Sequence, residues 1–199
     1  MASYILENPP TSLTIDGAEY PIQTDFRAVL RYDRIIREER PDGSELEDAL
    51  TLMYGGIPAN VVKAMLQLNW FVQCGQEERK HKPSNQLLGI NNDKPMDYEV
   101  DSRLIWAAFR RVYGIDLRAV EYLHWWDFQE LLAELPSDVR LNRIIEIRTK
   151  DTNHKRLSKE ERTLYKALQR YYKLREPVTE KQEKLREALR NGEDPTPYL

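Results

Sequence analysis

Few side chains in this 199-residue sequence have the types and spacings that catalysis needs. The one cysteine, Cys74, ends an apolar stretch, where a small buried hydrophobic residue is a simpler interpretation than a nucleophile. His81, His124 and His154 are not four residues apart and have no cysteine close in sequence, so they form no local metal site. The sequence also has no glycine-rich phosphate loop and no nucleophile elbow. We therefore expect a protein that is not an enzyme, with no cofactor, no metal and no small-molecule substrate.

Aromatic side chains suited to binding another protein cluster in one segment: Tyr122, Trp125, Trp126 and Phe128. These rings span nearly two turns of a predicted helix, so they cannot all face a single stripe. At least one ring is therefore expected near the surface, where an exposed Trp often anchors a protein interface. Packing in the core is the alternative for each ring.

A second candidate binding element is the predicted β-hairpin over residues 11–22. Asp16-Gly17 is a dipeptide typical of a two-residue type I′ turn. Around that turn Ile15 faces Ala18 and Leu13 faces Tyr20, which places the apolar side chains on one face. The hairpin edge could accept a strand of a partner, or the apolar face, with Leu13 and Tyr20, could pack on the core.

The third candidate is the basic C-terminal part of the chain. Residues 1–139 contain fourteen Lys and Arg against twenty-three Asp and Glu, a balance of −9, whereas residues 140–190 contain sixteen against eight, a balance of +8. Tyr171 and Tyr172 lie among these cations, a pattern compatible with nucleic-acid binding. Acidic residues are interleaved through the same region, however, and the chain as a whole carries −3. A solvated or self-paired surface is therefore the favoured interpretation.

Helical periodicity and capping patterns predict the elements that position these residues. The predicted helices cover residues 25–40, 44–54, 58–74, 99–113, 122–135, 137–148, 158–174 and 179–190. The third of these is apolar on most sides and is expected at the centre of the core. A long polar loop is expected over residues 76–96. The sequence thus predicts a mainly α fold: residues 1–149 form a hairpin and a helical core, and residues 150–199 form a basic helical extension, docked or partly flexible.

Composition also bears on the cellular location. A single cysteine fits a reducing compartment. No segment approaches the roughly 20 apolar residues of a membrane helix, and no N-terminal signal is recognisable. We therefore expect a soluble protein of the cytoplasm with no membrane partner.

Four ordered blocks of the sequence resemble the gene-product-fifteen family of phages and prophages of Gram-positive bacteria. The blocks are IDGAEYPIQTDFRAVLRY from Ile15, LNWFVQCG from Leu68, YEVDSRLIWAAFRRVYGIDL from Tyr98 and YLHWWDFQELLAELPSDVRLNRIIEIRT from Tyr122. They cover most of the chain up to Thr149, and the LHWW block is the most specific. The family has no established catalytic residues. Its signature positions are compatible with a role in the fold rather than in a site: Asp25, Phe26, Arg27, Trp106, Phe109, Tyr113, His124 and Trp125.

The resemblance implies a role in tail morphogenesis of long-tailed phages. A protein of this kind would be a tail assembly chaperone in the host cytoplasm that binds the tape-measure protein, presents it to the tail-tube protein, and self-associates in many copies. The alternatives are a tail or connector protein retained in the virion and a nucleic-acid-binding regulator that uses the basic C-terminal helices.

Overall fold

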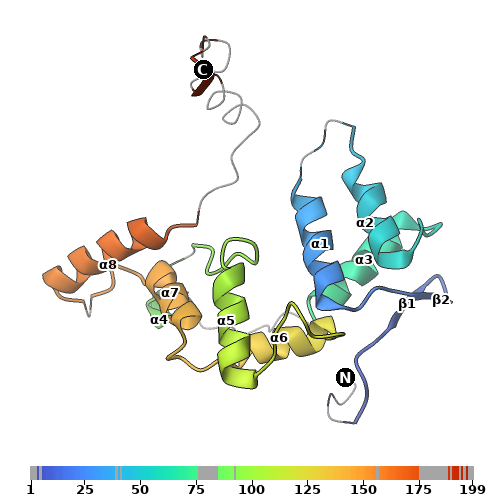
Figure 1. Cartoon of the computed structure of the whole chain (residues 1–199), viewed down its shortest axis with the longest axis horizontal. Coiled ribbons are helices and arrows are strands. Elements are labelled where there is room, and N and C mark those ends of the chain that lie inside the picture. Colours follow the sequence, from blue (N-terminus) through green and yellow to red (C-terminus); the bar gives the residue numbers. More distant parts are fainter. Residues whose placement is uncertain are drawn as a thin grey trace. The chain divides into compact units, whose positions relative to one another are not determined.

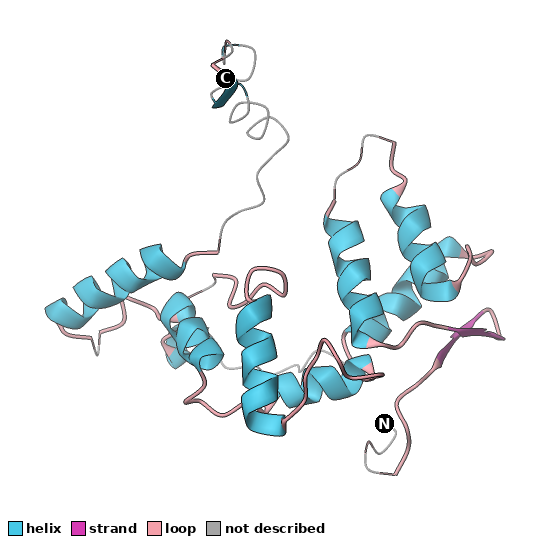
Figure 2. Cartoon of the chain, viewed as in Figure 1, coloured by secondary structure: helices cyan, strands magenta, loops and turns pink. Residues whose placement is uncertain are grey.

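The computed structural model describes residues 4, 6–38, 40, 42–75, 85–91, 93–155, 157–174, 188, 190–192, 194 and 196. Over these residues the fold is mainly α, with a two-stranded hairpin near the N-terminus, as predicted (Figures 1 and 2). The helix expected over residues 179–190 and the first part of the expected loop lie largely outside the described residues. Where the loop is described, it contains a short helix, α4 (Asn85–Leu88), that the sequence did not predict.

The hairpin pairs β1 (Ser12–Ile15) with β2 (Ala18–Pro21) in antiparallel register. Leu13 faces Tyr20 and Ile15 faces Ala18, which confirms the predicted register. Asp16 and Gly17 both have positive φ, at 52° and 83°, as a type I′ turn requires. β1 packs against helix α3, and this contact covers the apolar face of a hairpin that would be marginal alone.

The described chain divides into two compact units. The first comprises residues 1–83 and 101–143, and the second comprises residues 84–100 and 144–199. This division differs from the expected boundary after Thr149, because segment 84–100 pairs with the end of α7: Ile90 forms a β-bridge with Lys150. Helix α7 (Arg140–Thr149) therefore begins in one unit and ends in the other.

The first unit is built from helices whose apolar stripes meet in one core. Its helices are α1 (Phe26–Arg37), α2 (Glu45–Tyr54), α3 (Val61–Val72), α5 (Ser102–Tyr113) and α6 (Trp125–Ala133). Helix α1 lies beside α2 and also packs on α6, while α5 packs on α6 (Figure 1). The largest fully buried side chains of this unit are Phe71, Phe109, Phe128, Leu50, Met53, Leu68, Leu141 and Val29.

Among the described residues of the second unit, α8 is joined to the end of α7 by hydrogen bonds. The side-chain amide of Gln169, on α8 (Lys159–Tyr172), donates to the carbonyls of Ile147 at 3.0 Å and Lys150 at 2.8 Å. Ser158 and Glu161 form the predicted capping box at the start of α8. No side chain of α8 is fully buried, so this helix keeps much of its apolar stripe in contact with solvent.

Candidate binding surface

Three of the eight residues predicted to bind a partner lie in the core of the first unit. Leu13, Trp125 and Phe128 are only 3%, 3% and 1% exposed. Phe128 stacks between Phe26 and Phe109, with ring centroids 4.9 and 5.1 Å away. These side chains stabilise the fold and offer no surface to a partner, because helix α6 turns them inward and β1 lies on α3.

The other five predicted residues are at least partly accessible. Tyr20 is half-buried and packs edge-on against Tyr54, whereas Tyr122 is 53% exposed and shares a hydrogen bond of 2.7 Å with Thr24. Tyr171 is 80% exposed on α8 and packs edge-on against Tyr172, which is half-buried. The structure therefore does not bring the eight residues together into one site.

Trp126 joins the start of α6 to the end of α3. Its indole N–H donates to the carbonyl of Phe71 at 2.8 Å, and the indole of Trp125 donates to that of Val72 at 2.9 Å. Two consecutive tryptophans thus donate to carbonyls in the last turn of α3, where the carbonyl of Phe71 also accepts the backbone N–H of Cys74 at 2.9 Å. Gly75 follows with φ of 65°, and a Cβ there would lie 3.0 Å from the Trp126 ring. The glycine therefore permits the close packing of this indole.

His124, at the start of α6, connects three segments of the first unit through hydrogen bonds and a β-bridge. As the N-cap residue, its Nδ1 accepts the backbone N–H of Trp126 at 3.0 Å. Nε2 then carries the proton and donates to the carbonyl of Pro10 at 3.1 Å. His124 also forms a β-bridge with Asp25, the N-cap of α1. The ring is 5% exposed, and burial lowers the pKa of His124 below its ordinary value.

The lowered pKa of His124 predicts a loss of stability in mild acid. Above about pH 6.5 the imidazole is neutral in both states, so the folded state bears no penalty. As the pH falls below that value the unfolded chain binds a proton that the folded chain does not, and stability falls until the pH reaches the folded-state pKa. His124→Asn keeps an N-cap acceptor but cannot titrate, so its stability should change less between about pH 7.5 and pH 5. Urea unfolding at several pH values measures this difference; parallel losses in both proteins would contradict it.

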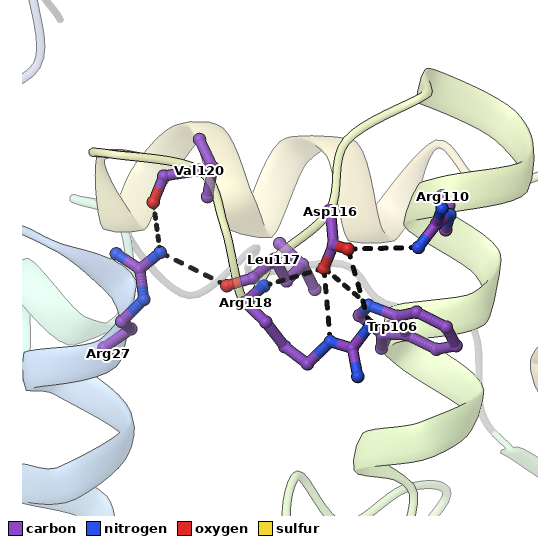
Figure 3. A network of polar contacts seen from close by, with 7 residues as sticks. All are labelled: Arg27, Trp106, Arg110, Asp116, Leu117, Arg118 and Val120. Carbon is purple, nitrogen blue, oxygen red and sulfur yellow. Dashed lines mark hydrogen bonds and ion pairs between the residues drawn. The ribbon is translucent and has the colours of Figure 1, made fainter.

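A polar network around Asp116 fixes the loop between α5 and α6 (Figure 3). Its carboxylate accepts the indole N–H of Trp106 at 2.7 Å and contacts the guanidinium groups of Arg110 and Arg118, while Arg118 also lies over the Trp106 ring at 4.3 Å. The hydrogen bond from Trp106, followed by those from Arg118, lowers the pKa of Asp116 to about 2. Because this carboxylate accepts several hydrogen bonds and stays ionised, it is suited to fixing the loop and not to proton transfer.

Arg27 of α1 holds the other side of the same loop. Its guanidinium pairs with Asp25 at 3.0 Å. It also donates to the backbone carbonyls of Leu117 and Val120 (Figure 3). Asp25, Arg27, Trp106 and His124, which are signature positions of the resemblance, therefore act here as scaffold.

The surface feature that the sequence analysis missed is an apolar stripe on α3. Val62, Leu66 and Trp70 follow one another at four-residue spacing and are 70%, 63% and 40% exposed. The opposite face of α3 buries Ala64, Leu68 and Phe71. The expectation that this helix lies at the centre of the core is thus only half right. An apolar helix covered on one side leaves a second apolar face in water, and such faces mark interaction sites.

Helix α6 carries an acidic face beyond the Trp70 end of this stripe. Trp126 packs on Trp70 with ring centroids 5.6 Å apart, and the next residue, Asp127, begins a carboxylate row with Glu130 and Glu134 at spacings of three and four residues. Helix α6 contains no Lys or Arg. The row lies on one face of α6 because residues at this spacing are helix neighbours. We call the set Val62, Leu66, Trp70, Trp126, Glu130 and Glu134 the α3–α6 surface.

Burial first, and then the charge of Glu130, raises the pKa of the Cys74 thiol to about 12, so the sulfur stays protonated at neutral pH. Within the described part of the chain, no group of three or more His, Cys, Asp or Glu side chains is arranged to hold a metal ion. Among the same residues, no helix is long and apolar enough to span a membrane.

A family model described as "Bacteriophage Gp15 protein" matches residues 6–174, which include both the α3–α6 surface and α8. No curated protein and no solved structure matches the chain.

Proposed function

The chain belongs to the bacteriophage Gp15 family, and from this premise we propose that it is a tail assembly chaperone that binds helical segments of the tape-measure protein. The observation that carries the proposal is the uncovered apolar stripe on α3. A protein whose residues are 32% charged nevertheless leaves Val62, Leu66 and Trp70 in water on one helix face. Such a face can take the apolar side of another helix at the same spacing.

The size of the stripe favours a reversible contact, which a chaperone needs. Full burial of one side chain of this size contributes about 1.5–3 kcal/mol, and association itself has a cost of several kcal/mol. Three such side chains therefore support binding that can be undone when the tail-tube protein takes over the tape measure. The carboxylates of Glu130 and Glu134 lie beyond the Trp70 end of the stripe, so they favour segments that carry Lys or Arg at one end of their apolar side.

The test is binding of a purified tape-measure fragment to single variants of the full chain. Val62→Glu should weaken binding about tenfold or more, because it places a carboxylate within the apolar contact. Val100→Glu is the matched control, since Val100 is 57% exposed outside the α3–α6 surface and should bind like the unmodified protein. Equal binding by both variants would reject the α3 stripe as the site, and no binding by the unmodified chain would reject the function.

A second measurement separates a chaperone from a tail or connector protein. A chaperone leaves the tape measure before the tail is complete, so mass spectrometry of purified particles should detect this chain at trace level or not at all. Abundant chain in mature tails would contradict the proposal.

A further inference from the structure

We propose that Tyr4 is a displaceable cover over Trp126, and that a bound helix must remove it to occupy the Trp70 end of the α3 stripe. The proposal rests on the proposed function, because it names a device that regulates the same site. It adds that the chain competes through one of its own side chains with its partner.

The side chain of Tyr4 lies on the start of α6. Its ring is almost parallel to the indole of Trp126, at 15°, with ring centroids 6.4 Å apart. Its hydroxyl donates to the carboxylate of Asp127 at 2.7 Å. Burial first, and then this hydrogen bond, raises the pKa of Tyr4, so the hydroxyl keeps its proton at neutral pH. One side chain therefore makes both an aromatic and a polar contact with the first turn of α6.

The indole that Tyr4 covers adjoins the α3 stripe. Trp70, the last residue of the stripe, packs on Trp126 with ring centroids 5.6 Å apart and is itself 40% exposed. Phe71 also stacks on this indole, at 6.1 Å, but it is fully buried and belongs to the core. A partner side chain that extends past Trp70 onto Trp126 must therefore take the place of Tyr4.

Tyr4 is attached weakly enough to be displaced. Its side chain is 45% exposed, and residues 6–8 are exposed as well, with Leu6 at 83%. The chain is held again at Pro10, whose carbonyl accepts a hydrogen bond of 3.1 Å from His124. Tyr4 can therefore move away from α6 while Pro10 and the hairpin after it stay in place.

A cover of this kind has two physical consequences. In the unbound chain it removes part of the large apolar surface of Trp126 from water, and it shortens an apolar patch of the kind that promotes non-specific association. It also lowers the affinity for a partner, because the partner occupies this end of the stripe only in the fraction of molecules that Tyr4 has left. The cover thus supports the release that a chaperone needs.

Binding of a purified tape-measure fragment to variants of the full chain tests this competition. Tyr4→Ala should bind about three- to tenfold more tightly than the unmodified protein, because an aromatic contact and a hydrogen bond no longer oppose the partner. Tyr4→Phe keeps the ring but loses the hydrogen bond to Asp127, so its affinity should lie between the two. Leu6→Ala is the matched control, since it truncates a neighbouring side chain that is 83% exposed and should bind like the unmodified protein.

Quenching of tryptophan fluorescence by acrylamide, an uncharged quencher, measures the cover without a partner. Tyr4→Ala should be quenched more strongly than the unmodified protein, because Trp126 loses the ring that lies on it. Leu6→Ala should be quenched to the same extent as the unmodified protein.

Equal quenching of Tyr4→Ala and the unmodified protein would overturn the proposal, and so would equal affinity for the fragment. Weaker binding by Tyr4→Ala would also overturn it, because Tyr4 would then be part of the contact with the partner. Failure of the proposed function is distinguishable from these results. In that case neither the unmodified chain nor Tyr4→Ala would bind the fragment, while the difference in quenching would still decide whether Tyr4 covers Trp126.

Discussion

Phe128→Ala is expected to destabilise the first unit by about 3–5 kcal/mol, a large part of the stability of a domain of this size. Phe128 is 1% exposed and stacks against Phe26, Phe109 and Trp125, with ring centroids 4.9, 5.1 and 5.6 Å away. Alanine would leave a cavity where three helices meet. Trp125 cannot move into the cavity without losing its hydrogen bond to the carbonyl of Val72.

Urea unfolding followed by tryptophan fluorescence measures this loss. Tyr171→Ala is the control, since its ring is 80% exposed on α8 and its loss should change the free energy of unfolding by about 0.5 kcal/mol or less. A loss below about 1 kcal/mol for Phe128→Ala would contradict the described packing of this core.

Local sequence patterns were sufficient for the hairpin and for most helices. Asp16-Gly17 and the alternation around it give the register directly, and Ser158 with Glu161 gives the start of α8. In both cases the determining contacts lie within a few residues of one another. The pattern in the sequence therefore carries the same information as the structure.

The candidate surface could not be predicted in the same way, because exposure depends on which elements cover a helix. The sequence of α3 is apolar around most of its circumference, and periodicity cannot tell which side a neighbour covers. The two tryptophans of α6 are the same residue type and adjacent in the sequence. Nevertheless Trp125 is 3% exposed, whereas Trp126 is half-buried against Trp70. The sequence nevertheless contained one indication of an uncovered apolar face: α3 is short and nearly uncharged, although the chain as a whole is highly charged.

The division of the chain into units also depends on contacts that are distant in sequence. Segment 84–100 joins the C-terminal helices through bonds such as that from the backbone N–H of Asn91 to the carbonyl of Thr149, at 2.7 Å. Composition changes near residue 150, and a boundary based on composition follows that change. Backbone pairing between a polar loop and the end of a helix leaves no such mark in the sequence.

Arg148→Met is expected to release α8 from the second unit. Arg148 is 7% exposed; its guanidinium donates to the carbonyl of Tyr172 at 2.7 Å and to that of Pro95 at 3.2 Å. Methionine fills a similar volume but donates no hydrogen bond, so both carbonyls would lose a charged donor. Each such bond contributes about 1.5–3 kcal/mol. With no fully buried side chain on α8, little apolar burial remains to hold the helix.

Hydrogen exchange of the α8 amides measures this release directly. The free energy of local opening should fall by about 2–4 kcal/mol, which corresponds to a loss of protection of about thirtyfold or more, while amides of α1 in the first unit keep theirs. Lys166→Met is the matched control, because it removes an exposed cation from the same helix and should leave protection unchanged. Unchanged exchange in Arg148→Met would mean that the other contacts of α8, such as those of Gln169, fix the helix without Arg148.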